Sequence, residues 1–167
     1  MTGAVVWLTG PPASGKSTLA RRLAERLRAL GREPLVLDGD EARAALVPRP
    51  GYDDAGRDGF YRTLGGLAVL AAAQGLIVIV AATAHRRVWR DLVRDRAPRF
   101  VEVHVATPID ECRRRDPKGL YARTDAGAAL PGRGVPYEPP TAPEVVAPRG
   151  DDPAVVDAIL AQLGCGQ

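Results

Sequence analysis

The sequence has no apolar run approaching the roughly 20 residues that a membrane-spanning helix needs. Its first apolar stretch, "AVVWLT" at residues 4–9, runs directly into a glycine- and proline-rich turn, which predicts a strand and not a secretory signal. We therefore predict no membrane partner, and we expect a cytoplasmic protein.

Cysteine and histidine are scarce, which argues against a metal centre built from these residues. Cys112 and Cys165 lie far apart, and neither belongs to a CxxC motif or stands beside a histidine. This usage is typical of free thiols in a reducing compartment. His85 and His104 are isolated as well, so we expect surface or strand histidines and not metal ligands.

The chain also lacks a strong excess of charge of one sign. Its 23 basic and 20 acidic residues leave a formal net charge of +3, which gives little support for a nucleic-acid partner. The one short basic block, "CRRRD" at 112–116, ends a predicted helix, where cations suit the helix dipole. We predict no nucleic-acid partner.

Alternating strand and helix patterns indicate the fold class. Predicted strands cover 4–9, 33–38, 75–83, 100–107 and 143–147, and predicted helices cover 15–30, 40–47, 57–73, 86–96, 108–115 and 152–163. Such alternation predicts a parallel sheet with helices on both faces. With 167 residues, we expect one α/β domain over 1–167, of the P-loop kinase type, with a five-stranded, mainly parallel sheet.

One long segment fits neither pattern. Residues 116–143 are rich in glycine and proline and have no strong apolar period. A disordered linker is one interpretation, but a long irregular excursion between a helix and a strand of one domain is more often a lid or binding segment. We predict a lid over about 116–138.

The stretch "GPPASGKS" matches the phosphate-loop pattern G-x-x-x-x-G-K-[ST]. An apolar strand precedes it and an amphipathic helix follows, which is the context that the motif needs. The loop N–H groups and the helix N-terminus would surround phosphates, Lys16 would reach the β- and γ-phosphates, and Ser17 would bind Mg²⁺. A ligand-free glycine turn is the alternative. The predicted nucleotide-binding residues are Gly10, Pro11, Pro12, Ala13, Ser14, Gly15, Lys16, Ser17 and Thr18.

Other features narrow the class of nucleotide-binding protein. An NKxD-like guanine motif is missing, and the third predicted strand ends in "AATA" without an acidic residue. Two carboxylates, Asp38 and Asp40, instead end the second strand, at the sheet edge where ligands bind. They can accept a proton from an acceptor hydroxyl or hold Mg²⁺, although Asp40 could also cap a helix over 41–47. We predict an ATP-dependent small-molecule kinase, with Asp40, Asp38 and Lys16 as catalytic residues and Ser17, Asp38 and Asp40 at the metal.

Together with "LDGDEAR" and "GLIVIVA", the segments "RDPKGLYARTDAG" and "PYEPP" give the chain a specific resemblance to adenylylsulfate (APS) kinases, from Val5 to about Val146. The resemblance implies phosphorylation of adenylyl sulfate to 3′-phosphoadenylyl sulfate (PAPS) by ATP and Mg²⁺. It implies that Asp40 contacts the acceptor hydroxyl, and it suggests a homodimer. It also implies acceptor contacts from Arg43, Tyr52 and Arg57.

In the lid, the resemblance places Lys118 and Arg123 near the phosphates or near the anionic group of the acceptor. Closure of such a lid would exclude water and protect the γ-phosphoryl group from hydrolysis.

Several positions depart from the family pattern in the expected acceptor pocket. Phe60 replaces an acceptor-contacting Asn, and Ala82 replaces a Phe near Arg87, which is kept. The lid is two residues shorter, with Leu130 where a Phe would stack on adenine. Losing such contacts weakens adenine recognition by ~1–3 kcal/mol per aromatic ring. A different nucleotide-like anionic metabolite is therefore an alternative acceptor. An ATPase or regulatory module without an acceptor and a resistance-type phosphotransferase are further alternatives.

Overall fold

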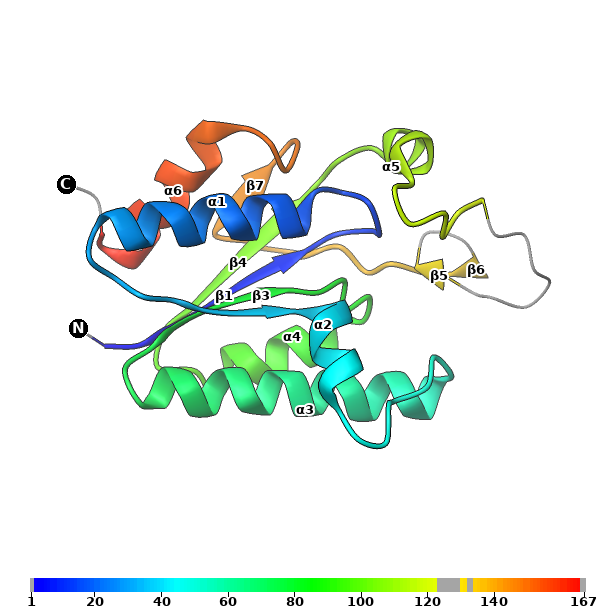
Figure 1. The fold of residues 1–167 in the computed structure, drawn as a ribbon, viewed down its shortest axis with the longest axis horizontal. Coiled ribbons are helices and arrows are strands. Elements are labelled where there is room, and N and C mark those ends of the chain that lie inside the picture. The colour runs from blue at the N-terminus through cyan, green and yellow to red at the C-terminus, as the bar shows by residue number, and fades with distance from the viewer. Residues whose placement is uncertain (1, 123–129, 132–133, 166–167) are drawn as a thin grey trace.

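Five apolar segments form one parallel sheet in the computed structural model, which describes residues 2–122, 130–131 and 134–165. The strands lie side by side in the order β2 (Leu35–Asp38), β3 (Ile77–Ala81), β1 (Ala4–Thr9), β4 (Phe100–Val105) and β7 (Val145–Ala147) (Figure 1). All four pairings between neighbours are parallel. The predicted sheet is confirmed, although β2 and β3 are shorter than the expected 33–38 and 75–83.

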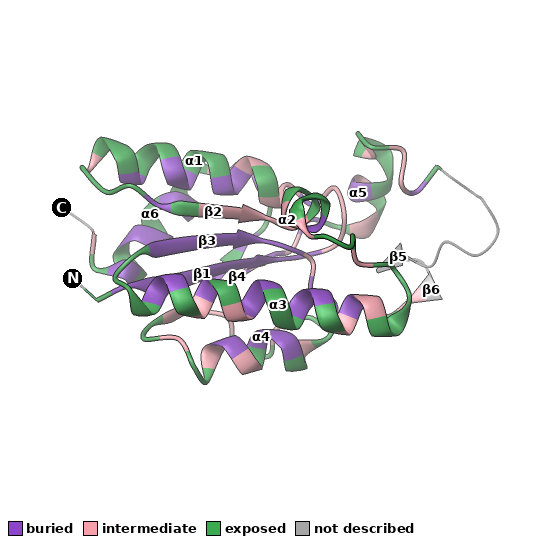
Figure 2. Cartoon of the chain, turned by 60° about the horizontal axis from the view of Figure 1, so that its bottom comes forward, coloured by how far each residue is buried: buried purple, intermediate pink, exposed green. Residues whose placement is uncertain are grey.

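Helices cover both faces of the sheet, so its central strands are buried throughout (Figure 2). Helices α1 (Lys16–Ala29) and α6 (Pro153–Leu163) pack on one face, and α3 (Asp54–Ala73) and α4 (Arg87–Arg94) pack on the other. Alternate residues of β1 point to the two faces, as strand geometry requires. Burial on both faces explains why "IVIVA" in β3 shows no polar alternation.

The short helices and the helix ends decide where the loops lie. Helix α2 (Gly39–Ala45) follows β2 without a gap, and α5 (Ile109–Arg115) follows β4 after a short loop. Gly31, at φ 72°, stands directly after the C-cap of α1, which confirms the expected stop signal. The segments that follow β1, β2, β3 and β4 all leave from the same end of the sheet (Figure 1).

The predicted lid follows α5 at that end. Within it the structure describes two short strands, β5 (Leu130–Pro131) and β6 (Gly134–Val135), which pair with each other. Arg123, expected to contact phosphates or the acceptor, lies outside the described residues. In the part of the chain that is described, every helix is too short or too polar to cross a membrane.

Candidate active site

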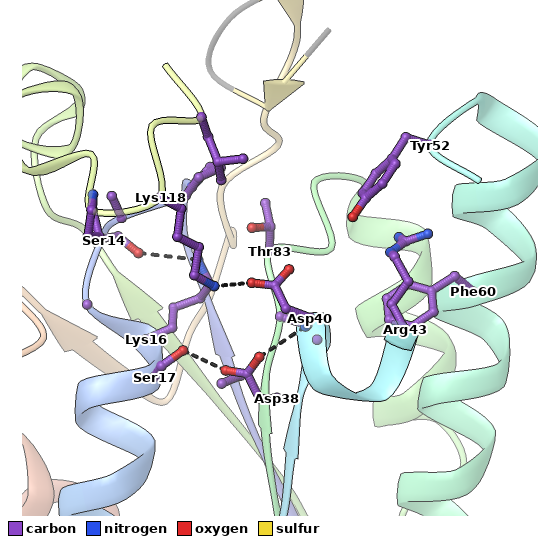
Figure 3. Close-up of a pocket in the computed structure, with 18 of the residues that line it drawn as sticks. Ser14, Lys16, Ser17, Asp38, Asp40, Arg43, Tyr52, Phe60, Thr83 and Lys118 are labelled. Atoms are coloured by element: carbon purple, nitrogen blue, oxygen red, sulfur yellow. Dashed lines mark hydrogen bonds and ion pairs between the residues drawn. The ribbon is translucent and has the colours of Figure 1, made fainter. Parts of the chain in front are cut away.

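A cavity of about 980 Å³ lies at the carboxyl ends of the strands, as the topology requires of a ligand site in such a sheet. The phosphate loop lines one side of the cavity, and α2 and the start of α3 line the other (Figure 3). The predicted site residues that line it are Pro12, Ala13, Ser14, Gly15, Lys16, Ser17, Thr18, Asp38, Asp40, Arg43, Tyr52, Arg57, Phe60 and Lys118.

The phosphate loop folds around its own lysine. The Lys16 ammonium donates to the carbonyl oxygens of Gly10 and Pro11, each at 2.8 Å. Lys16 lines the cavity, and these two partners are not among the residues that line it. Gly15, at φ 100°, takes a left-handed conformation that favours glycine. Burial lowers the pKa of Lys16 to about 8. A bound phosphate would replace the carbonyls as the partner of this ammonium.

Three residues that sequence reasoning missed hold the loop from behind. The buried Thr107 hydroxyl donates to Ser14 O at 2.7 Å, and the Tyr121 hydroxyl donates to Pro12 O at 2.9 Å. Gly150, after β7, packs backbone to backbone on Gly15, so close that a Cβ at position 150 would lie 2.7 Å from the Gly15 Cα. These partners stand about 90 to 140 positions away, and no local pattern signals them.

Asp38 is held by both sides of the cavity. Its Oδ1 accepts from Asp40 N at 3.0 Å and Glu41 N at 3.5 Å, which makes Asp38 the N-cap of α2. Its Oδ2 accepts from the Ser17 hydroxyl at 2.6 Å (Figure 3). The alternative that Asp40 caps a helix over 41–47 is therefore wrong, because the helix begins two residues earlier, at Gly39.

Asp40 faces the cavity and meets a cation from the segment after α5. Its Oδ2 accepts from the Lys118 ammonium, and the two side chains are 64 % and 55 % exposed (Figure 3). This hydrogen bond raises the pKa of Lys118. The structure thus joins two residues that the sequence placed in separate motifs, and it leaves the Asp40 carboxylate accessible once Lys118 moves.

Arg43 is stacked between two aromatic rings on the side of the cavity formed by α2 and the start of α3. Its guanidinium carbon lies 4.4 Å from the centroid of Tyr52 and 3.9 Å from that of Phe60 (Figure 3). Its Nη1 donates to Pro50 O at 3.2 Å and to Gly51 O at 2.8 Å, and the residue is only 4 % exposed. Arg43 therefore fixes the loop between α2 and α3, and its contact with the acceptor stays a prediction.

The aromatic residues near this stack differ in what they offer a ligand. Phe60 is 2 % exposed beneath Arg43, and Tyr61 is buried against Trp89 with ring centroids 4.6 Å apart. Tyr52, in contrast, is 57 % exposed and lines the cavity. Of these rings, Tyr52 is the one with an open face. The almost fully buried Arg57 also contributes to the cavity wall.

One expected acceptor contact, Arg87, is not among the described residues that line the cavity, and a second, Leu130, stays a prediction. Arg87 starts α4, and its Nη1 donates to Pro139 O at 3.3 Å, while its backbone N–H donates to Glu138 Oε2 at 2.7 Å. Leu130 lies in β5, and its side chain is outside the described part.

The "PYE" sequence has a structural task that its motif did not reveal. The Tyr137 hydroxyl forms a 2.9 Å hydrogen bond with Thr9 Oγ1 at the end of β1. Glu138 N donates to His85 O at 2.8 Å, and the buried Arg90 donates to Glu138 O at 2.6 Å. The end of the lid segment is thus anchored where β1 and β3 end.

His85 corrects one expectation. It is neither on the surface nor in a strand, because it lies in the loop after β3, 3 % exposed, with its ring 5.0 Å from Trp89. Its Nδ1 has no hydrogen-bond partner among the described residues, and burial, followed by the Arg57 charge, lowers its pKa to about 4. His104 lies on β4, as expected. Cys112 and Cys165 are free thiols.

Comparison of the sequence with known proteins identifies related kinases. A family model described as adenylylsulphate kinase matches residues 2–148. The bifunctional enzyme NodQ of Azospirillum brasilense is 48 % identical over 146 residues, which cover 85 % of this chain and 24 % of NodQ. The adenylyl-sulfate kinase of Picosynechococcus is 43 % identical over 145 residues, covering 86 % of this chain and 82 % of that enzyme.

A solved structure agrees over the whole chain. The Mycobacterium tuberculosis APS kinase CysC, determined in complex with AMPPNP and APS, is 35 % identical and superposes with a TM-score of 0.86, covering 98 % of both chains. The likeness in fold therefore extends over nearly the whole chain. By sequence and by fold, the chain belongs to the adenylylsulphate kinase family.

Proposed function

We propose that this protein transfers the γ-phosphoryl group of ATP to the 3′-hydroxyl of adenylyl sulfate, forming PAPS and ADP. One observation carries the proposal: the phosphate loop and Asp40 face one another across a single cavity, which is what a direct transfer between two bound substrates needs. Family membership, and the binding of AMPPNP and APS by the M. tuberculosis relative, support it.

The donor half of the cavity would bind ATP through the phosphate loop. The N–H groups at the start of α1 would face the phosphates, whose negative charge the helix dipole favours. Lys16 would leave the carbonyls of Gly10 and Pro11 and donate to the β- and γ-phosphates. Thr107 and Gly150 keep the loop in place during this exchange.

The residues present fit Mg²⁺ as the metal. Ser17 and Asp38 offer oxygen ligands, and the 2.6 Å hydrogen bond between them shows that both reach one point. Mg²⁺ is usually bound by one or two carboxylates together with phosphates and waters, and Asp38 and Ser17 supply one carboxylate and one hydroxyl. When bound, Mg²⁺ would offset charge on the β- and γ-phosphates.

Asp40 would act as the general base. The proton of the acceptor hydroxyl passes to the Asp40 carboxylate, the hydroxyl oxygen bonds to the γ-phosphorus, and the bond from that phosphorus to the bridging oxygen of ADP breaks. The exposed ion pair with Lys118 must open first, and it can do so cheaply because such pairs contribute only ~0–1 kcal/mol. Lys118 is then free to face the transferring phosphoryl group.

The acceptor half would hold the nucleotide with Tyr52, Arg57 and the loop fixed by Arg43. A second candidate acceptor, another nucleotide-like anionic metabolite, is favoured by one observation. Phe60 is buried under Arg43 and Ala82 adds no ring to the wall, so Tyr52 is the single ring with an open face in the described part of the cavity. A homodimer and a cytoplasmic location stay predictions.

A coupled assay of ADP release tests the proposal. The purified chain is given Mg-ATP with APS, with AMP, with cytidine nucleotides, or with no acceptor. We expect APS to raise the rate well above the rate without acceptor, and the product to be PAPS. Equal rates with and without every acceptor would make the protein an ATPase, and a preference for another nucleotide would establish the second candidate.

A further inference from the structure

Arg49 is a cavity residue to which the proposed mechanism gives no role. It lies in the loop between α2 and α3, is exposed to solvent, and lines the cavity on the acceptor side. We propose that Arg49 is a further, specificity-determining cation that binds the anionic group of the acceptor. The inference rests on the proposed function, because it concerns the same acceptor.

The other cations of the cavity wall are already engaged within the protein. Lys16 donates to loop carbonyls and Lys118 pairs with Asp40. Arg43 donates to Pro50 O and Gly51 O, and Arg115 pairs with Glu111. Arg57 is almost fully buried and has an interaction of its own. In the described part of the chain, Arg49 is the cavity-lining cation that has no hydrogen bond or ion pair.

The loop holds the backbone of Arg49 in place while its side chain stays free. Proline fixes φ at its own position and restricts the residue before it, and Arg49 stands between Pro48 and Pro50. Arg43 then binds the carbonyls of the next two residues. Because the backbone of this loop is already fixed, binding an anion costs the rotamer freedom of the Arg49 side chain but not the ordering of the loop.

The same loop carries the open aromatic face of the cavity. Tyr52 follows Arg49 by three residues and is 57 % exposed. The acid nearest along this loop, Asp53, is used as the N-cap of α3, accepting from Gly56 N at 3.2 Å. A nucleotide whose base stacks on Tyr52 would therefore meet an uncommitted guanidinium, whose fork of N–H donors matches a sulfate or phosphate group.

Three variants test the assignment: Arg49→Gln, Arg49→Lys, and Arg32→Gln as a matched control. Arg32 is exposed, lacks a side-chain partner in the described structure, and lies beyond the opposite end of α1 from the cavity. Binding of APS and of adenosine to protein loaded with Mg-AMPPNP is measured by calorimetry at two salt concentrations, and KM for ATP is measured alongside.

We expect Arg49→Gln to weaken APS binding about fivefold to tenfold and to flatten its salt dependence, while adenosine binding and the KM for ATP stay unchanged. Arg49→Lys should recover part of the loss, because it keeps the charge without the fork. Arg32→Gln should behave as the wild type.

Two failures are distinguishable. If Arg49→Gln binds APS as tightly as the wild type, or loses adenosine and APS affinity equally, the role of Arg49 is overturned and the proposed function stands. If the wild type neither binds nor phosphorylates APS, the proposed function is overturned, and the inference that rests on it falls too.

Discussion

An Asp40→Asn substitution should stop phosphoryl transfer while leaving the fold intact. The amide keeps the shape and one acceptor oxygen of the carboxylate but cannot take up the hydroxyl proton, so kcat should fall by about 10²–10⁴. The described partner of Asp40 is Lys118, in an ion pair whose side chains are both more than half exposed. Its loss changes the free energy of unfolding by at most ~1 kcal/mol.

The neighbouring Asp38→Ala substitution, in contrast, should lower the free energy of unfolding. It removes the N-cap of α2, at a cost of about 0.5–2 kcal/mol, and it leaves the Ser17 hydroxyl without its acceptor, at about 1 kcal/mol more. A loss near 2 kcal/mol lowers the Tm of a domain of this size by roughly 4–8 °C. The KM for Mg-ATP should rise as well, because Ser17 and Asp38 would both hold the metal.

The two variants are compared with the wild type by ADP release at saturating ATP and APS and by thermal unfolding without ligands. The reasoning is refuted if Asp40→Asn keeps a kcat within about threefold of the wild type, far less than a general base contributes. It is refuted equally if Asp38→Ala melts at the wild-type temperature, since the cap contacts of Asp38 would then contribute nothing.

Three further predictions concern pH and packing. Because burial lowers the pKa of Lys16 to about 8, kcat/KM for ATP should fall as the pH rises through about 8, and Lys16→Arg should remove this fall. A wild-type kcat/KM that stays constant up to pH 9 would contradict this prediction. The pKa of His85 is lowered from 6.5 to about 4, so the unfolded state binds more protons than the folded state between these two pH values. The free energy of unfolding should therefore fall by about 3 kcal/mol as the pH drops through this range. In urea unfolding, His85→Leu should show a weaker dependence of that free energy on pH, and an unchanged dependence would count against the prediction. Gly150→Ala should push the Gly15 backbone and raise the KM for ATP by up to about 10²-fold, whereas Gly66→Ala, where a Cβ meets nothing within 4 Å, should leave that KM unchanged; equal KM values for both variants would show that the contact does not matter.

The fold was predictable because each strand has a local sequence pattern that indicates it. Runs such as "AVVWLT" are apolar over a short length, are bounded by turn residues and alternate with helical patterns, so no long-range information was needed. The strand ends were less predictable. Residues 33 and 34, for example, were counted in the second strand, but β2 begins at Leu35; Glu33 pairs with Arg28 instead, and Pro34 has no N–H to donate to a sheet.

The site was predictable where one motif supplies it and not where distant segments meet. The sequence identified the phosphate loop and both aspartates, but "DGD" alone could not show that Asp38 caps α2, because that depends on the helix beginning at Gly39. The burial of Arg43 between Tyr52 and Phe60 depends on how α2, α3 and the loop between them pack together. The same holds for His85, which its loop turns into the core.

Asp38 has a consequence for how the substrates influence one another. The Asp38 side chain accepts hydrogen bonds from Ser17, in the first turn of α1, and from the backbone of the first turn of α2. Helix α2 carries Arg43, which holds the loop of Tyr52 and Arg49 through its hydrogen bond to Gly51 O. A triphosphate that draws Ser17 away therefore alters a support of the opposite wall. Thermodynamic reciprocity then requires the second substrate to change the affinity for the first by the same factor.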